Sequence, residues 1–393
     1  MAGTPKHRKL FRFERLSGVL MVAAMAIAFV AANTSLKPYY DLVHHMPVHV
    51  RIGGLRIDRP MIEWVNEGLI VVFFLLVGLE IKRQLLEGHL ADRKVAVLPA
   101  IAAFGGMVVP AGLYLAVTWR RPEFWTGWAV PTATDIVLVL GLLALMGDRI
   151  PVQIKILFTA LATFDDIGAV AILAIFFNEA PRALPLLVGI GAVAGLAVIN
   201  GRRMTRPWPY IALGLVLWVA MLEAGLEAAL AGVIVGLFVP LRGPTAESGS
   251  PLRTTERRLH PMGVLIVVPL FAFFNSGIAV PEIDARVMLS PAPIGVVAGL
   301  LIGKPVGILV SSWLAVRTGV AALPAGIGWR HMLGVAQVAG IGFTMSLFIA
   351  QIAFADAATV VAVKLAVLVG SAASVLVGLW MMAVFMPRQG DRC

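Results

Sequence analysis

The sequence has few charged residues and almost no cysteine. Only 14% of its 393 residues are charged, against about 25% in an ordinary soluble protein. The single cysteine, Cys393, is the last residue, which excludes a disulfide framework, a thiolate metal cluster and a catalytic thiol. A soluble protein of this length would carry a charged surface, so the composition argues against a soluble globular fold.

Long apolar runs take the place of the missing charge. Hydrophobic residues make up 59% of the chain, and a helix that crosses the hydrocarbon core of a bilayer needs about 20 residues. We therefore predict an all-α polytopic membrane protein with about 12 transmembrane helices, which form a single transmembrane domain over residues 16–386. The predicted spans are 16–33, 61–86, 94–118, 124–146, 152–178, 183–200, 208–222, 225–240, 258–279, 292–316, 330–352 and 360–386. The seventh and eighth spans are short, and a single re-entrant hairpin is the alternative there.

The basic residues predict the orientation of the chain. With a cytoplasmic N-terminus, 22 Lys and Arg residues fall on the inside and eight on the outside, as expected because cytoplasmic loops are richer in positive charge. Residues 1–15 are then a basic cytoplasmic N-terminus and 387–393 a cytoplasmic tail. The apolar run after this basic start is too long for most secretory signals, so we expect an uncleaved first span. The net charge of +10 lies in short loops, and no nucleic-acid partner is expected.

A short segment between the first two spans has the pattern of a strand pair. Residues 48–58, VHVRIGGLRID, alternate apolar and polar side chains around Gly53-Gly54, which predicts a β-hairpin with a tight glycine turn on the outer side. An isolated hairpin is marginal in water. Contact with the membrane surface, or edge-to-edge pairing with the hairpin of a second copy, would stabilise it. The hairpin is therefore a weak indication of a homodimer, and an ordered loop without a partner is the alternative.

Charged side chains inside apolar spans are the main functional signal. Each costs about 2.5 to 3.5 kcal/mol at mid-membrane, so a purely structural need for several of them is implausible. The five residues concerned are Glu80, Asp135, Asp165, Asp166 and Lys304.

Asp165 and Asp166 are adjacent within one predicted span. Neighbours on a helix point about 100° apart, so both can be hydrated only beside a wide aqueous cavity. Carboxylate oxygens suit hard alkali cations as well as protons. The pair therefore predicts a site where a cation and protons compete, and a carboxylate pair that caps a helix break is the alternative.

Lys304 is a lysine at the middle of a span. A buried ammonium needs a carboxylate partner or loses its proton, and Asp165 or Asp166 is the natural candidate. An ion pair that breaks when the cation binds would link proton binding to cation release. A purely structural salt bridge is the alternative.

Two of the predicted spans contain residues that interrupt helices. Pro131 removes a helical hydrogen bond in the fourth span, so the backbone is expected to unwind from Pro131 to Asp135. Asp135 would then lie at the start of a half-helix, where a negative charge is favourable. A simple proline kink is the alternative. Gly340, Gly342 and Thr344 weaken the eleventh span in the same way. Seven spans separate the two, so they run in opposite directions. We therefore predict two broken, crossing helices within inverted-topology repeats, spans three to five and ten to twelve, with a binding site at the midplane.

Six motifs follow one another along the chain. They are FFLLVGLEIKRQL (73–85), PTATDI (131–136), FDDIGA (164–169), LAGVIVGLFVPL (230–241), GLLIGKP (299–305) and GIGFTMSLFIA (340–350). Together, in this order, they resemble the bacterial NhaA-type sodium/proton antiporter family, and the resemblance extends over residues 11 to 385.

The resemblance implies roles for individual residues. Asp165 and Asp166 would be the carboxylates that bind Na+ or Li+ and protons, with Lys304 as the partner of Asp165. Asp135 and Thr134 would supply charge and dipoles where the unwound chains cross. A cytoplasmic pH-responsive cluster would contain Glu80 and Arg83, with Glu256 and His260 as further candidates.

The implied function is secondary active transport. The protein would exchange cytoplasmic Na+ or Li+ for external protons across the bacterial inner membrane, electrogenically and at alkaline pH, in sodium and pH homeostasis. It would be no enzyme and need no cofactor, with the lipid bilayer and the transported ions as its partners.

A sodium-coupled symporter for an organic substrate is the alternative, but it needs a second polar pocket. An intramembrane aspartyl protease needs carboxylates that face each other from separate segments, and a passive channel needs no lysine that competes for the site.

Two positions depart from the family pattern. Gln84 stands where the family usually has an acidic residue, and Glu227 where its best-known members have a histidine. A histidine titrates near neutrality and a typical glutamate near 4.3. The resemblance therefore does not fix the pH at which this protein becomes active.

Overall fold

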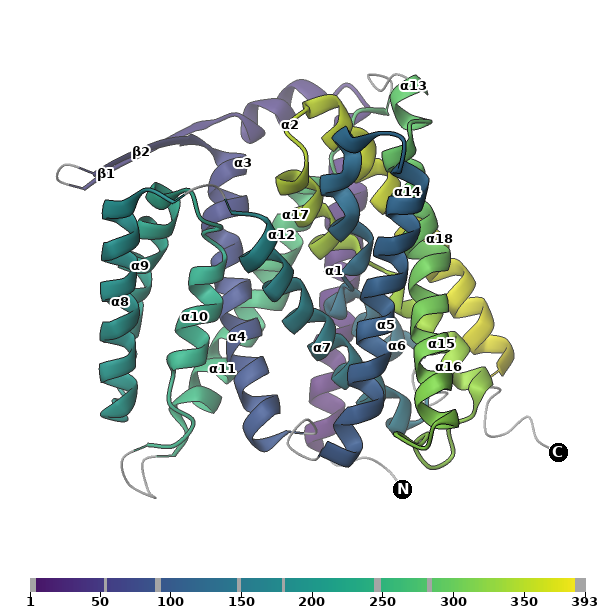
Figure 1. Ribbon diagram of the computed structural model, residues 1–393. Coiled ribbons are helices and arrows are strands. Elements are labelled where there is room, and N and C mark those ends of the chain that lie inside the picture. The colour runs from purple at the N-terminus through teal and green to yellow at the C-terminus, as the bar shows by residue number, and fades with distance from the viewer. Residues whose placement is uncertain are drawn as a thin grey trace. The chain divides into compact units, whose positions relative to one another are not determined.

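The computed structural model describes residues 5–52, 55–88, 93–146, 150–178, 181–243, 249–280 and 285–385. These residues are mostly helical, and many of the helices are long and apolar (Figure 1). The chain divides into two compact units. Unit 1 comprises Met1–Thr34, Asp92–Ala169 and Asn275–Cys393, and unit 2 comprises Ser35–Ala91 and Val170–Phe274.

Unit 1 is entirely helical in its described part, and it contains both interrupted spans. Its helix α5 packs along α15, where a Cβ atom on Gly105 would lie 2.5 Å from the Gly307 carbonyl oxygen. Small residues allow such close approach between membrane helices. Its elements are α1 (Pro5–Ala32), α5 (Arg93–Thr118), the 3-10 helix η3 (Pro122–Thr132), α6 (Ile136–Met146), the first part of α7 (Val152–Phe176), α13 (Ala285–Met288), α14 (Pro291–Ala298), the π-helical turn η8 (Gly299–Gly303), α15 (Lys304–Arg317), α16 (Trp329–Ala339), α17 (Phe343–Ala353) and α18 (Ala357–Phe385).

Unit 2 combines helices with the strand pair. Helix α10 packs on α4, and α8 packs on α9. Its elements are α2 (Lys37–His44), β1 (Pro47–Ile52), β2 (Leu55–Pro60), α3 (Met61–Glu63), the π-helical turn η1 (Trp64–Leu69), α4 (Ile70–Glu87), the rest of α7, α8 (Ala183–Gly201), α9 (Trp208–Ala224), α10 (Leu230–Phe238), α11 (Pro251–Met262), the π-helical turn η6 (Gly263–Val267) and most of α12 (Val268–Ser276).

The predicted hairpin is confirmed. Strands β1 and β2 pair antiparallel from Pro47 opposite Pro60 to Ile52 opposite Leu55, so the pairing extends slightly beyond residues 48–58. His49 and Asp58 face each other in this register, and their side chains lie 2.8 Å apart, Nδ1 to Oδ1. The predicted glycine turn at Gly53-Gly54 lies outside the described residues.

The membrane-spanning character of the helices agrees with the predicted fold class. Within the described part of the chain, nine helices are long and apolar enough to cross a membrane, and the pair α16 and α17, bent by 45°, makes a tenth. Helix α9 is apolar but shorter, and α10, within predicted span 225–240, has nine residues. The count of twelve therefore stays a prediction.

One predicted boundary is wrong by a full two turns of helix. The ninth span was expected to begin at residue 258, but α11 begins at Pro251. Ser250 caps this helix, since its hydroxyl accepts a hydrogen bond from the Arg253 amide at 3.2 Å, and proline is favoured at the first helical position. The first two turns are polar, so hydropathy alone places the start too late.

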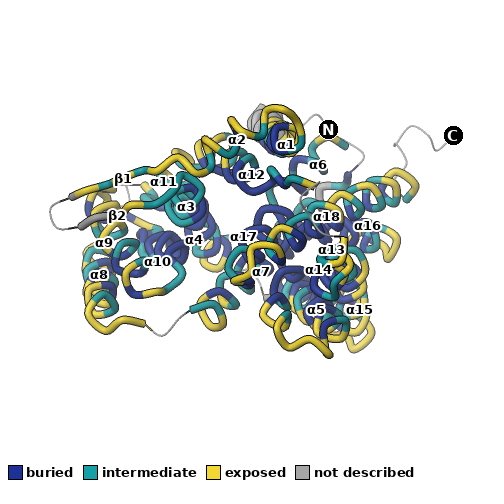
Figure 2. The backbone as a smooth tube through the Cα atoms, turned by 90° about the horizontal axis from the view of Figure 1, so that it is seen from above, coloured by how far each residue is buried: buried dark blue, intermediate teal, exposed yellow. Residues whose placement is uncertain are grey.

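Many of the helices have a buried side and an exposed side. Figure 2 shows that buried and exposed residues alternate along many of the helices. On α8, for example, Leu184 is 75% exposed and Leu187 is 64% exposed. Apolar side chains with this exposure are typical of a surface in contact with lipid.

Candidate functional site

The adjacent carboxylates lie in the continuous part of a helix in unit 1. Asp165 and Asp166 belong to α7, which runs without interruption from Val152 to Phe176. The pair therefore does not cap a helix break. Asp165 is 1% exposed and Asp166 is 9% exposed. The two carboxylates thus differ in access, as expected for neighbours that point in different directions from one helix.

Lys304 contacts the more buried of the two carboxylates. Its Nζ atom lies 3.0 Å from Asp165 Oδ2 and donates to the Thr132 carbonyl oxygen at 2.5 Å. The charge of Asp166 also acts on this ammonium. Lys304 is 0% exposed, and it follows the π-helical turn η8, a local widening that is frequent at functional sites. The geometry selects Asp165 from the two candidate partners.

Thr134 completes the contacts of Asp165. The Thr134 hydroxyl lies 2.5 Å from Asp165 Oδ2 and 3.0 Å from the Ala339 carbonyl oxygen. A hydroxyl has one proton to donate, so it can serve only one of these acceptors at a time. The other carboxylate oxygen, Asp165 Oδ1, is buried and has no hydrogen-bond partner among the described residues. A buried oxygen in this condition is suited to a bound cation or proton.

Asp135 lies between the starts of two half-helices. Its Oδ1 atom accepts the Leu138 amide of α6 at 2.9 Å. Its Oδ2 atom accepts the Thr344 amide of α17 at 3.0 Å and the Thr344 hydroxyl at 2.5 Å. The backbone is also joined, because the Asp135 amide donates to the Ile341 carbonyl oxygen at 2.7 Å. One carboxylate therefore compensates the positive ends of two helices.

The interruptions differ slightly from those predicted. The 3-10 helix η3 includes Pro131 and continues to Thr132, so only residues 133–135 leave the helical conformation before α6. This is an interruption and not a simple proline kink. In the other interrupted span, Gly340, Ile341 and Gly342 separate α16 from α17. A Cβ atom on Gly340 would collide with the Leu300 carbonyl oxygen, so glycine is required there by the close approach of the backbone.

A cation at this site would have to use few carboxylates. The described residues contain no group of three or more His, Cys, Asp or Glu side chains that could hold a metal ion. Na+ or Li+ would be the transported substrate, with Asp165 and Asp166 as its charged ligands. Hydroxyl and carbonyl oxygens such as those of Thr134 and Thr132 are chemically suited to supply the remaining contacts.

A second cluster brings together the residues proposed for the pH response, all in unit 2. Arg83 donates from Nε to Glu256 at 3.0 Å and from Nη2 to Glu80 at 3.2 Å. The charges of Glu80 and Arg83 both act on His260. Gln84, the departure from the family pattern, is buried and donates to Glu80 at 3.5 Å. It therefore contributes to the cluster as a neutral hydrogen-bond donor.

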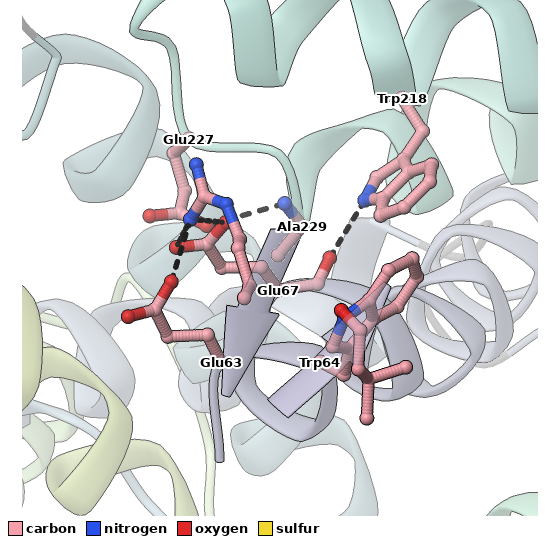
Figure 3. A network of polar contacts seen from close by, with 8 residues as sticks. Glu63, Trp64, Glu67, Trp218, Glu227 and Ala229 are labelled. Atoms are coloured by element: carbon pink, nitrogen blue, oxygen red, sulfur yellow. Dashed lines mark hydrogen bonds and ion pairs between the residues drawn. The ribbon is translucent and has the colours of Figure 1, made fainter. Parts of the chain in front are cut away.

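A third network, also in unit 2, surrounds Glu227 (Figure 3). Arg59 donates to Glu63 at 3.1 Å and to Glu67 at 2.7 Å, while the Trp218 indole donates to the Glu67 carbonyl oxygen at 2.7 Å.

Glu227 lies in the loop between α9 and α10, where its carboxylate accepts the Ala229 amide at 3.2 Å. Burial raises the pKa of Glu227 to about 7, and the charge of Glu67 also raises it. A typical glutamate has a pKa near 4.3, so burial moves the pKa of the Glu227 carboxyl into the range of a histidine.

Sequence reasoning missed several polar groups that the structure places in contact. The sequence pattern marks Thr344 only as a weak point of its span, and it assigns Lys364 no role. The pairing of Arg253 with Glu87 at 2.6 Å and of Arg59 with Glu67 at 2.7 Å had no sequence signal, because the two partners of each pair lie in different predicted segments. Lys364 did carry a signal, since a lysine inside an apolar span needs an explanation.

Comparison with known proteins shows the family of the chain. The family model described as Na+/H+ antiporter 1 matches residues 8–382. A protein of Shewanella baltica (strain OS155 / ATCC BAA-1091) named Na(+)/H(+) antiporter NhaA is 42% identical over 385 residues, 98% of each chain. A protein of the same name from Shewanella loihica is 41% identical over 387 residues, again 98% of each chain. The chain therefore belongs to the Na+/H+ antiporter 1 family.

Proposed function

We propose that this protein is a secondary antiporter that exchanges cytoplasmic Na+, or Li+, for external protons. The observation that carries the proposal is the buried Asp165–Lys304 pair at 3.0 Å, with Thr134 and Asp166 beside it. A buried ammonium and a metal cation are alternative positive partners for one carboxylate. Membership of the family supports the same exchange.

The proposed cycle follows from this competition. A cation that binds Asp165 and Asp166 breaks the Asp165–Lys304 pair. The Lys304 ammonium and the Asp166 carboxyl then each lose a proton to the cytoplasmic side. A conformational change then exposes the carboxylates to the outside, where protons replace the cation and the Asp165–Lys304 pair forms again. With more than one proton for each cation, the exchange carries net charge and the membrane potential drives it.

We also propose activation at alkaline pH. A higher cytoplasmic pH favours deprotonated carboxylates, which bind cations better, so transport should increase with pH. Glu80, Arg83, Glu256 and His260 are the proposed pH-responsive residues, since their charges interact in one cluster. The cycle needs no cofactor, because Asp165, Asp166 and Lys304 supply its proton and cation sites.

The proposed location is the bacterial inner membrane, with both termini cytoplasmic. This orientation rests on the excess of Lys and Arg in the predicted inside segments and on the apolar helices. We further propose a homodimer formed through the strand pair β1 and β2, because a two-stranded hairpin leaves unpaired strand edges.

A proton-gradient assay in everted membrane vesicles tests the exchange. Addition of Na+ or Li+ should dissipate an acid-inside gradient, more strongly as the pH is raised from about 6 to about 9. Asp166→Asn should abolish the response while the variant keeps its melting temperature in detergent. Glu123→Gln, which alters an exposed carboxylate, serves as the control and should respond as the unmodified protein does. Failure of both cations to dissipate the gradient at every pH would refute antiport, and full activity of Asp166→Asn would remove that residue from the site.

A further inference from the structure

A second lysine within a predicted span has no role in the cycle described above. Lys364 lies in α18, and its Nζ atom donates to Asn275 Oδ1 at 3.1 Å and to Gln351 Oε1 at 2.5 Å. Both acceptors are neutral amides, and no ion pair found among the described residues includes Lys364. A charged group at membrane depth needs compensation. The compensation must therefore come from something other than a carboxylate in contact with it.

Helix α17 supplies that compensation. Gln351 lies in the last turn of α17, which ends at Ala353, and the C-terminal end of a helix carries partial negative charge. The opposite end of the same helix donates its Thr344 amide to the Asp135 carboxylate. α17 thus has a negative group at its positive end and a positive group at its negative end. Both charges lie where the helix dipole favours them.

Helix α18 holds α17 at both ends. Near the start of α17, the Phe343 amide donates to the Ser371 hydroxyl oxygen at 3.3 Å, and near its end Gln351 accepts the Lys364 ammonium. Phe343 and Gln351 are about 12 Å apart along α17, and Lys364 and Ser371 are about 10 Å apart along α18, at a rise of 1.5 Å per residue. The spacings match for two antiparallel helices, so these two contacts set the register between α17 and α18.

A shift of α17 would reach the buried ion pair through adjacent contacts. The chain that enters α17 accepts the Asp135 amide at Ile341 and the Thr134 hydroxyl at Ala339. Thr134 in turn contacts Asp165. The position of α17 therefore determines how Asp135 and Thr134 are held beside the proposed cation site.

We propose that Lys364 is a positioning residue for transport, which fixes the C-terminal end of α17 and so keeps its first amides directed at Asp135. This inference rests on the proposed antiport function. Asn275, buried at the end of α12, orients the ammonium. Lys364 does not touch the cation, and its effect on cation binding passes through α17.

Kinetics in everted vesicles test this role at one alkaline pH. Lys364→Met removes the charge but keeps much of the side-chain length, and should raise the apparent KM for Na+ about 3- to 10-fold, the range expected for a charge at a helix end. The maximal rate per folded protein should stay within about twofold, since the cation site itself is intact. Lys364→Arg should keep the KM within about twofold of the unmodified protein, because it restores a cation at the same helix end. Lys37→Met, which removes a half-exposed lysine, is the matched control and should change neither parameter.

A double-mutant cycle separates positioning from general stability. Gln351→Leu should raise the KM for Na+ as Lys364→Met does, and the double variant should show no further rise, because both changes remove one contact. The proposal would be overturned if the KM for Na+ stayed unchanged in Lys364→Met and Gln351→Leu, even if both variants melted at lower temperature. It would also be overturned if the double variant raised the KM by the product of the two single effects. If Lys364→Met does not fold, Gln351→Leu and Lys364→Arg still decide the question. An unmodified protein that fails to respond to Na+ would instead refute the antiport function.

Discussion

Glu227 shows how far the environment of one residue changes its chemistry. Burial in the loop between α9 and α10 raises the pKa of its carboxyl to about 7, and the nearby charge of Glu67 adds to this effect. A histidine at this position would also titrate near neutrality. The Glu227 carboxyl therefore changes charge in the same pH range as a histidine would.

The sign of the Glu227 effect on stability follows from this shift. Because the folded-state pKa lies above the unfolded value of about 4.5, protonated Glu227 stabilises the folded protein fully below that value, and this stabilisation is lost as the pH rises through about 7. Glu227→Gln keeps the oxygen that accepts the Ala229 amide but cannot ionise. The variant should melt at least about 2 °C above the unmodified protein at pH 8.5 and at nearly the same temperature at pH 5.

Thermal melting in detergent at the two pH values measures this difference. Glu223→Gln, four residues earlier and exposed, is the matched control and should leave the melting temperature unchanged at both. An equal shift of Glu227→Gln at both pH values would show that ionisation of Glu227 is not the cause.

At the scale of elements, glycines decide how the helices of unit 2 pack. Gly232 and Gly236 are one turn apart on α10 and face α4, where a Cβ atom on Gly236 would lie 2.8 Å from the Leu75 carbonyl oxygen. Gly78 on α4 meets α10 in return, with its Cβ position 2.5 Å from the Val233 carbonyl oxygen. Lipid tails are as apolar as the surfaces of such helices, so close van der Waals packing replaces the hydrophobic effect as the main attraction between them.

Replacement of one of these glycines should therefore destabilise the protein. Gly236→Ala would push α10 away from α4 and should cost about 1 to 3 kcal/mol, the usual range for overpacking. Gly191→Ala on α8 is the control, because a Cβ atom there meets nothing within 4 Å, and alanine favours the helix. Melting temperature and the yield of monodisperse protein measure both variants. Equal behaviour of the two would show that the α4–α10 approach tolerates a methyl group.

At the scale of the whole molecule, the candidate functions are divided between the two units. Unit 1 contains Asp165, Asp166 and Lys304 together with both interrupted spans, while unit 2 contains the proposed pH-responsive cluster and the hairpin. Helix α7 passes from unit 1 to unit 2 after Ala169, three residues beyond Asp166. Asp165 and Asp166 therefore lie close in sequence to the boundary between the two units within α7.

The proposed homodimer belongs to this scale as well. Replacement of residues 48–58 by a short flexible linker removes the strand pair and should convert a dimer in mild detergent into a monomer, because strand edges would no longer be available for pairing. Light scattering on purified protein, or native mass spectrometry, measures the mass of the complex. A dimer that survives the deletion, or an unmodified protein that is monomeric, would contradict the proposal.

The sequence by itself determined the features that depend on neighbouring residues. Apolar runs predicted the membrane helices, Pro131 and the glycines at 340 and 342 predicted the interruptions, and the alternation around Gly53-Gly54 predicted the hairpin. These signals are local, because hydrophobic transfer, helix breaking and strand alternation depend on short stretches of chain. Asp165, Asp166 and Lys304 also stood out, since charge inside an apolar run is expensive.

Only the tertiary structure decided which charged groups meet and how far they are buried. It brought Lys304 to 3.0 Å from Asp165, the partner that the family resemblance implied but that the residues alone left open. It also joined Arg83 to Glu256 and placed Lys364 at the end of α17. It also buried Glu227 enough to bring its titration near neutrality. These contacts join residues far apart in the chain, and a pKa depends on the local dielectric and on charges in three dimensions, which a linear sequence does not specify.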